Sequence, residues 1–252
     1  MTQQATRLTR PSYMLVVPDL ESLQRDAVQE FSTCALGAVR GAGRFSVALA
    51  GGNTPRGMYE LLAAQGAGLP WDKIHVFFGD ERHVPPDHPE SNYRMARETL
   101  LSKVAIPEGN VHRVPAELDA AAAAAAYENT LREFFQLQPG AFPHFDLVLL
   151  GMGDDGHTAS LFPGSRALAE GTHLVVANAV EKLNGERITL TLPVLNHAAN
   201  VVFMVSGASK APALRDVFDL ATPGDYPSRL VRPVNGRMLW IADKAAASLF
   251  NS

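Results

Sequence analysis

The sequence predicts an α/β protein built on a mostly parallel sheet with helices on both of its faces. Two observations predict this class. Short runs of β-branched and aromatic residues alternate along the chain with longer stretches of helical periodicity. Several short runs are apolar almost throughout, as in FDLVLL at 145–150, and such runs are typical of parallel strands buried on both faces.

The individual elements are predicted in chain order from these patterns. Apolar residues at helical spacing, including Phe31, Ala35 and Val39, follow the first strand. Pro55 suits the first turn of the next helix, and the alanine-rich block after Pro115 has the signals of a helix start. Strands are expected at residues 13–17, 45–50, 74–78, 145–150, 174–177, 188–192, 201–205 and 238–241. Helices are expected at residues 20–39, 55–64, 92–103, 117–135, 211–218 and 244–250.

Composition limits the classes of protein that fit this chain. The 252 residues include 22 Lys plus Arg and 26 Asp plus Glu, a formal charge of −4 that excludes a polybasic nucleic-acid binder. Apolar types make up 46% of the residues and charged types 19%, which is the balance of a compact domain. Cys34 is the single cysteine, so an internal disulfide is impossible.

Length and segment composition set the expected organisation and location. The length fits one large domain or two small ones, and no boundary in composition separates two. We therefore expect one domain over residues 1–252, with residues 1–12 as a loose N-terminal arm. No apolar run approaches the roughly 18 residues of a membrane span, and the first residues lack the pattern of a signal peptide. A cytoplasmic protein without membrane contact is expected.

In an open parallel sheet, ligands bind outside the carboxyl ends of the strands, so four loops that follow strands carry the functional expectations. The first reads AGGNTP and opens a helix. Gly51 and Gly52 allow a close approach of the backbone to a ligand, and Thr54 can cap the helix before Pro55. Free amides at a helix start favour an anion. The loop from Gly51 through Asn53 to Thr54 is either a phosphate cradle or a plain turn with a cap.

The second loop follows the aromatic strand at 74–78 and reads GDERHVPP. Arg82 offers a planar fork of donors to an anionic oxygen, and Asp80 suits either sugar hydroxyls or the orientation of the arginine. A solvated charged turn is the alternative. His83 and His88 match no compact zinc spacing, so no metal site is expected.

The third loop reads GMGDDGHTASLFP and contains a formal G-x-G-x-x-G pattern. A dinucleotide fingerprint should open a long helix, and here Pro163 interrupts within one or two turns. We predict instead a tight glycine turn that presents Asp155 and His157 to the crevice as a general acid or base. Asp155 either holds the imidazole tautomer or contacts the substrate.

The fourth loop reads SGASK and follows the strand at 201–205. Lys210 would add a positive charge for a phosphate at the start of the next helix, with Ser209 beside it. Arg187 is a further candidate cation. It enters its predicted strand rather than leaving it, so the crevice rule alone would place it at the wrong end.

Taken together, these motifs resemble the glucosamine-6-phosphate isomerase/6-phosphogluconolactonase family. The residues that carry the resemblance are AGGNTP at 50–55, FFGDERHVP at 77–85 with Ser91 and Asn92, GMGDDGHTASLFP at 151–163, RITL at 187–190 and SGASK at 206–210. They occur in the family's order, and the resemblance runs from about residue 14 to the end. Ala50 is one departure, because the family often has serine there.

The resemblance implies a Rossmann-like fold shared with glucosamine-6-phosphate deaminases and ribose-5-phosphate isomerases. It implies hydrolysis of 6-phospho-D-glucono-1,5-lactone to 6-phospho-D-gluconate, the second step of the oxidative pentose phosphate pathway, without metal or cofactor. The loop at 51–54, with Lys210 and Arg187, would hold the 6-phosphate. His157 would act as the general base, Asp155 would orient it or the sugar hydroxyls, and Arg82 would stabilise the oxyanion or bind the phosphate.

Two rival functions stay open at this point. One is a deaminase or isomerase acting on another sugar phosphate. The deaminase pattern has a glutamate where this chain has Phe162 and a tyrosine where it has Arg82. The other is a non-catalytic sugar-phosphate sensor, for which we expect a DNA-binding appendage that the sequence does not suggest. The expected partner is a phosphorylated sugar lactone, with no nucleic acid and no membrane, in a monomer or homodimer.

Overall fold

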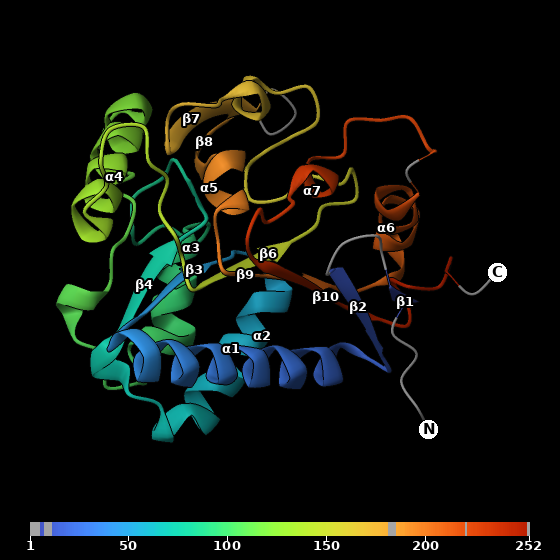
Figure 1. Cartoon of the computed structure of the whole chain (residues 1–252), viewed down its shortest axis with the longest axis horizontal. Helices are drawn as coiled ribbons and strands as arrows, with labels where there is room; N and C mark the ends of the chain where they lie inside the picture. Colours follow the sequence, from blue (N-terminus) through green and yellow to red (C-terminus); the bar gives the residue numbers. More distant parts are fainter. Residues whose placement is uncertain (1–5, 8–11, 181–184, 220, 251–252) are drawn as a thin grey trace.

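The main sheet of the computed structural model confirms the α/β class (Figure 1). The structure describes residues 6–7, 12–180, 185–219 and 221–250. Within these residues seven strands form the sheet, and every neighbouring pair is parallel except β1 with β2. In sheet order the strands are β1 (Thr6–Arg7), β2 (Ser12–Val17), β10 (Arg237–Asp243), β9 (Asn200–Val205), β6 (Leu147–Gly151), β3 (Phe45–Leu49) and β4 (Ile74–Phe78).

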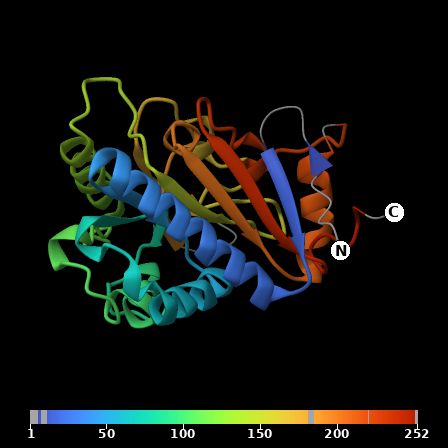
Figure 2. The same ribbon diagram turned by 60° about the horizontal axis from the view of Figure 1, so that its bottom comes forward.

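Helices cover both faces of this sheet, as predicted (Figures 1 and 2). The α-helices are α1 (Leu20–Ala42), α2 (Asn53–Gln65), α3 (Asn92–Ala96), α4 (Ala120–Phe135), α5 (Leu192–Asn196), α6 (Ala211–Phe218) and α7 (Pro227–Leu230). In Figure 1, α1 and α2 lie below the sheet, whereas α4, α5 and α7 lie above it. On α6, Phe218 contacts Trp240 of β10 with their rings 5.1 Å apart.

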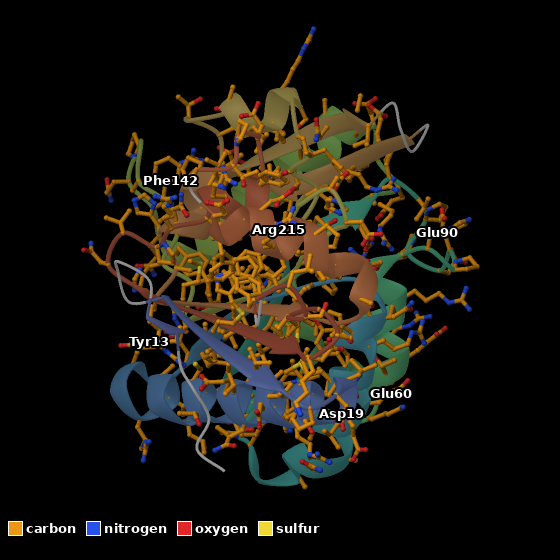
Figure 3. All side chains as sticks on the ribbon, turned by 90° about the vertical axis from the view of Figure 1, so that its right-hand side faces the viewer. Tyr13, Asp19, Glu60, Glu90, Phe142 and Arg215 are labelled. Atoms are coloured by element: carbon orange, nitrogen blue, oxygen red, sulfur yellow. The ribbon has the colours of Figure 1, made fainter. Side chains whose placement is uncertain are left out.

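Buried apolar side chains fill the space between the layers (Figure 3). All five residues of β3 are buried, as expected for a strand covered on both faces. Phe203 of β9 and Trp240 of β10 stack with ring centroids 3.7 Å apart. The labelled side chains of Tyr13, Glu60 and Glu90 lie at the periphery and are exposed. The core is therefore organised around the parallel strands that the sequence predicts.

A second, antiparallel sheet corrects part of the prediction. It has the order β5 (Asp80–Arg82), β8 (Gly185–Leu190) and β7 (Val175–Val180), and it contains the runs predicted at 174–177 and 188–192. Parallel neighbours need a crossover of a dozen or more residues, and the connection from β7 to β8 is far shorter. Antiparallel pairing is therefore the only arrangement available to these two strands.

Several predicted boundaries also shift. The run at 92–103 divides into α3 and a π-helical turn (Arg97–Leu101), and the segment 244–250 forms turns instead of a helix. The alanine-rich helix begins at Ala120 because the Asp119 carboxylate accepts hydrogen bonds from the first free amides. Short 3-10 helices occupy Gly66–Gly68, Trp71–Lys73, Glu108–Asn110, Arg166–Ala169 and Ala208–Lys210.

Two histidines at the edge of the main sheet make the stability of the fold depend on pH. His75 Nδ1 and His112 Nε2 lie 3.3 Å apart, and the His112 ring stacks on Phe77 with centroids 4.3 Å apart. Burial lowers the pKa of both imidazoles, that of His112 to about 4; the Arg44 charge further opposes protonation of His75, and His75 further opposes protonation of His112. The fold therefore holds this pair neutral.

We expect acid to destabilise the protein through this pair. An unfolded histidine takes up a proton below its ordinary pKa of about 6.5, so the contribution of the pair is complete above that pH and is lost as the pH falls toward 4. Because both rings are partly open to solvent, we expect a loss of about 1–2 kcal/mol between pH 7 and pH 4.5. Urea unfolding at the two pH values measures it. His112→Phe should show a smaller loss than wild type, and an equal loss would contradict this assignment.

Candidate active site

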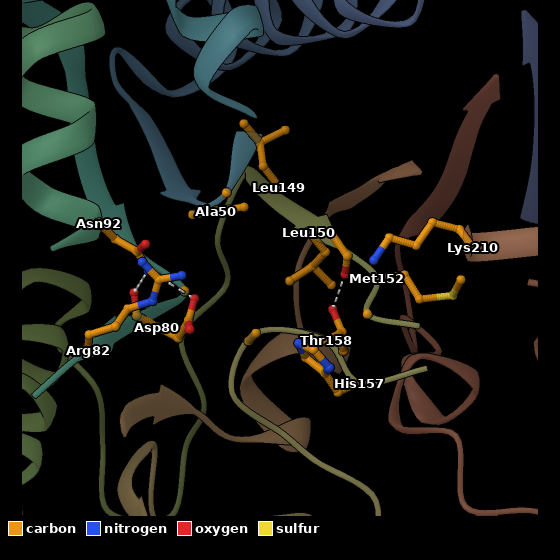
Figure 4. Close-up of a pocket in the computed structure, with 16 residues that line it drawn as sticks. Ala50, Asp80, Arg82, Asn92, Leu149, Leu150, Met152, His157, Thr158 and Lys210 are labelled. Carbon is orange, nitrogen blue, oxygen red and sulfur yellow. Dashed lines mark hydrogen bonds between the residues drawn. The ribbon is translucent and has the colours of Figure 1, made fainter. Parts of the chain in front are cut away.

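A pocket of about 210 Å³ opens at the carboxyl ends of the parallel strands (Figure 4). Its walls come from the loops after β3, β4, β6 and β9, which are the four loops singled out in the sequence. Six of the predicted site residues line it, namely Gly51, Gly52, Asp80, Arg82, His157 and Lys210. The other lining residues are Ala50, Gly79, Asn92, Leu149, Leu150, Gly151, Met152, Gly153, Thr158 and Ala159.

Four predicted residues are not in the wall of this pocket: Asn53, Thr54, Asp155 and Arg187. Asp155 contacts His157, and Arg187 is the strand partner of Arg82; His157 and Arg82 both line the pocket. Asn53 and Thr54 lie in the first turn of α2, whose N-cap residue is Gly52. Thr54 is therefore not the helix cap, which corrects the sequence prediction, and no side chain caps this helix start. The uncapped amides retain their capacity to bind an anion.

Asp155 holds the His157 ring through two contacts. Its Oδ1 lies 2.6 Å from His157 Nδ1, and the same oxygen accepts the backbone N–H of His157 at 3.2 Å. The turn is closed by hydrogen bonds between Gly153 and its neighbours, at 2.9 Å to His157 O and 3.0 Å from the Gly156 amide. An Nδ1–H that donates to the carboxylate leaves Nε2 as the acceptor. The geometry favours the first of the two roles considered for Asp155.

The His157 ring is also confined by Phe162 and by the backbone of Gly153. Phe162 stacks on it with centroids 4.3 Å apart and an interplanar angle of 29°. On Gly153, a Cβ atom would lie 2.0 Å from His157 Nδ1 and 2.8 Å from Asp155 Oδ1, so only glycine fits there. These contacts leave the imidazole little freedom to rotate. A side chain held in one orientation is what acid–base chemistry requires.

The three consecutive charges Asp80, Glu81 and Arg82 are explained by the alternation of strand β5. Glu81 points away from the pocket and is 2% exposed. Its carboxylate accepts hydrogen bonds from the backbone amides of Arg82, Asn92 and Tyr93 and from the hydroxyl of Ser91. Burial raises the pKa of Glu81, and these amide donors oppose the shift. Glu81 thus fastens β5 to the start of α3.

Asp80 lies in the pocket wall and is held by groups that the sequence reasoning did not identify. Ser160 Oγ donates to Asp80 Oδ2 at 2.6 Å, and Asn92 Nδ2 donates to Asp80 O at 2.9 Å. No hydrogen bond or ion pair joins Asp80 to Arg82 among the described residues, so the contact with Arg82 that the sequence offered is not formed. Asn92 also has a buried Oδ1 without a partner in the described structure, packed against Gly51. In the sequence, Asn92 is marked by its place after Ser91 at a helix start and by its part in the family resemblance, and neither signal assigns it to the site.

Antiparallel pairing brings Arg187 beside Arg82. The two residues are register partners across β5 and β8, although the crevice rule alone places Arg187 at the wrong end of its strand. Arg82 Nη1 donates to Glu90 O at 2.6 Å, and Arg187 Nη1 donates to Glu186 O at 3.0 Å. Neither guanidinium forms an ion pair within the described ranges. Burial and the Arg82 charge lower the pKa of Arg187. Like charges opposed in this way favour an anionic ligand nearby.

Lys210 stands on the other side of the pocket from Arg82, with His157 between them in the view of Figure 4. Its Nζ lies 2.5 Å from Asp154 Oδ1, and it lowers the pKa of that carboxyl group. The loop that carries Lys210 is anchored by the buried Asp243, which accepts hydrogen bonds from Ser206 Oγ and the Gly207 amide. The pocket therefore has a cationic group at each end.

The described part of the chain lacks two kinds of feature. No group of three or more histidine, cysteine, aspartate or glutamate side chains is placed to hold a metal ion there. No helix in that part has the length and apolar character needed to cross a membrane. The donors in the pocket wall are instead backbone amides and cationic side chains, which suit an anionic organic ligand.

Comparison with known proteins agrees with this geometry. Residues 18–240 match the family model described as glucosamine-6-phosphate isomerases/6-phosphogluconolactonase. A 6-phosphogluconolactonase of Nostoc sp. is 48% identical over 239 residues, covering 92% of this chain and 96% of the relative. A probable 6-phosphogluconolactonase of Arabidopsis thaliana is 38% identical over 247 residues, covering 91% and 90% of the two chains.

Solved structures show the same relationship. The 6-phosphogluconolactonase from Trypanosoma cruzi has a TM-score of 0.88 and 32% identity, covering 98% of this chain and 99% of the other. A monomeric glucosamine-6-phosphate deaminase has a TM-score of 0.77 at 20% identity over 94% of this chain and 99% of the other, and that likeness concerns the fold alone. On its sequence and its fold, this chain belongs to the glucosamine-6-phosphate isomerase/6-phosphogluconolactonase family.

Proposed function

We propose that this protein hydrolyses 6-phospho-D-glucono-1,5-lactone to 6-phospho-D-gluconate, the second step of the oxidative pentose phosphate pathway. The observation that carries the proposal is the Asp155–His157 pair on a pocket with a cationic group at each end. A histidine held by a carboxylate suits activation of water, and the two cationic ends suit a substrate with a phosphate and a reacting carbonyl. The relatives named 6-phosphogluconolactonase support the same assignment.

The proposed reaction begins with attack of water on C1 of the lactone. His157 Nε2 takes a proton from the water as its oxygen bonds to C1, and the carbonyl electrons move to the carbonyl oxygen. Collapse of this tetrahedral intermediate breaks the bond between C1 and the ring oxygen, which receives the proton from His157. The products are a C1 carboxyl group and a free hydroxyl, and His157 returns to its neutral form.

Arg82 is assigned to the oxyanion and Lys210 to the phosphate, because they lie on opposite sides of the pocket (Figure 4). The guanidinium of Arg82, with Arg187 as its register partner, places positive charge where the carbonyl oxygen becomes negative. Across the pocket from Arg82, Lys210 offers a positive charge to the phosphate, and the uncapped loop at Gly51 and Gly52 in the pocket wall adds backbone amides. Side chains and backbone amides of this pocket would thus serve both the oxyanion and the phosphate.

Lys210→Ala should raise KM for the lactone phosphate about tenfold or more and change kcat much less, because it removes a charged contact made equally before and during reaction. Steady-state kinetics at low ionic strength measures both constants. Inorganic phosphate should inhibit wild type competitively and Lys210→Ala more weakly. Unchanged KM and unchanged phosphate inhibition would mean that the phosphate binds elsewhere.

The direct test of the activity follows acid release from freshly prepared 6-phospho-D-glucono-1,5-lactone with and without the protein. The deaminase alternative predicts ammonia release from glucosamine 6-phosphate, and the aromatic ring of Phe162 against His157 stands where that chemistry has an acid. A sugar-phosphate sensor predicts binding without turnover. We further propose a cytoplasmic enzyme, monomeric or homodimeric, that acts on a small molecule and contacts no nucleic acid.

A further inference from the structure

We infer that Asp154 is a specificity-determining residue whose carboxylate occupies the anion position beside Lys210 in the free protein and competes there with the phosphate of the substrate. The inference deepens the proposed function and rests on Lys210 as the phosphate-binding cation. Asp154 has no role in the reaction scheme proposed above. We draw the inference from the contacts, the exposure and the charge of Asp154.

Two donors of one loop converge on a single oxygen of Asp154. Lys210 Nζ lies 2.5 Å from Asp154 Oδ1, and Ser209 Oγ donates to the same atom at 3.3 Å. An ammonium and a hydroxyl beside a helix start are the groups expected to bind phosphate oxygens. The carboxylate therefore stands where the structure offers its donors to an anion.

The ion pair between Lys210 and Asp154 can be broken at a small cost in free energy. The Asp154 side chain is 63% exposed, whereas that of Lys210 is 26% exposed and lines the pocket. An exposed carboxylate can turn into water and keep its hydration, and an ion pair of this kind contributes little to stability. A dianionic phosphate makes a stronger contact with the same donors. Phosphate should therefore displace the carboxylate from Lys210. Because that ion pair must first be broken, phosphate should bind more weakly than it would to an unpaired lysine.

Competition between Asp154 and the phosphate affects both substrate binding and product release. A carboxylate next to the phosphate site weakens the binding of every anion there, by occupying Lys210 and by repulsion of like charges. Substrate and product carry the same phosphate, so both are affected. Asp154 therefore raises KM and speeds release of the anionic product. A dianion also attracts Lys210 more strongly than a singly charged group does, so it displaces the Asp154 carboxylate more easily.

The test uses inorganic phosphate as the probe, measured as a competitive inhibitor and by calorimetry at low ionic strength. Asp154→Asn keeps the shape of the side chain and an oxygen that can accept from Lys210, but removes the charge. We expect phosphate to bind about threefold or more tightly to this variant and KM to fall in the same proportion. The difference should shrink in 0.5 M salt, because salt screens exposed charges.

The matched control is Asp72→Asn. Asp72 forms an exposed ion pair with Lys73, with 3.4 Å between Asp72 Oδ2 and Lys73 Nζ. It lies directly before β4, so it is at the amino ends of the strands, opposite the pocket. The substitution changes the net charge by the same amount, and it should leave phosphate binding and KM at their wild-type values. An equal effect of both substitutions would overturn the inference, because total charge would then explain the result.

The Lys210 variants separate this inference from the proposed function. In Lys210→Ala, the further change Asp154→Asn should no longer tighten phosphate binding, since the contested cation is absent. If Asp154→Asn weakens phosphate binding or leaves it unchanged while Lys210→Ala weakens it strongly, Asp154 does not compete and the phosphate site stands. If Lys210→Ala has no effect on phosphate, the phosphate site itself is wrong.

Discussion

His157→Ala should lower kcat for lactone hydrolysis by about 100-fold and leave KM within about threefold of wild type. The imidazole lines the pocket with the Asp155 carboxylate on its Nδ1, so under the proposed mechanism its removal takes away the acceptor for the proton of the attacking water. Little of the binding should be lost, because the proposed phosphate contacts come from other loops. The expected loss therefore falls on the chemical step.

Steady-state kinetics on freshly prepared lactone, corrected for spontaneous hydrolysis, measures this effect. His173→Ala is the matched control, because His173 is also a histidine beside an acidic side chain: its Nδ1 lies 3.5 Å from Glu128 of α4, its side chain is 66% exposed, and it is outside the pocket wall. It should keep kcat near wild type. If His157→Ala is folded and turns over at the wild-type rate, His157 is not the general base.

Gly153→Ala should lower kcat by about as much as loss of the histidine itself, roughly 100-fold. The new Cβ would lie 2.0 Å from His157 Nδ1 and 2.2 Å from Cε1, closer than any real contact, and Phe162 stacks on the ring. The imidazole must leave its place between Asp155 and the pocket. The substitution removes none of the donors assigned to the phosphate, so phosphate inhibition should stay within about threefold of wild type.

Gly171→Ala is the control for the change of glycine to alanine. A Cβ at Gly171 meets no atom within 4 Å, and the residue is outside the pocket wall. It should leave both kcat and the midpoint of thermal unfolding close to wild type. Gly153→Ala is informative only with a folded protein, so its circular dichroism is compared with wild type. A folded Gly153→Ala variant with normal kcat would show that the ring position does not matter.

The parallel sheet could be predicted from the sequence because burial on both faces leaves a direct mark on composition. The run at 145–150 is apolar almost throughout, and its strand β6 lies in the interior of the main sheet, between β9 and β3. Strand direction in the second sheet leaves no such mark. Only the short connection between β7 and β8, read together with the crossover rule, would have revealed it.

The site could be predicted as far as it depends on strand ends. His157, Arg82 and Lys210 follow parallel strands, and the structure brings all three to one pocket. Arg187 could not be placed from its own strand, because its position depends on antiparallel pairing with β5. Asn92 enters through a partly buried hydrogen bond to Asp80, which is a tertiary contact between residues twelve positions apart. Single side-chain contacts of this kind have no signature in local sequence.

The alternation of β5 restricts how this segment can change in length during evolution. In a strand, insertion or deletion of one residue moves every later side chain to the opposite face. Such a change before residue 81 would turn the Glu81 carboxylate toward the pocket and drive the Arg82 guanidinium among the amides that Glu81 now satisfies. Relatives that keep this chemistry should therefore accumulate substitutions around these positions but share one spacing from β4 to α3.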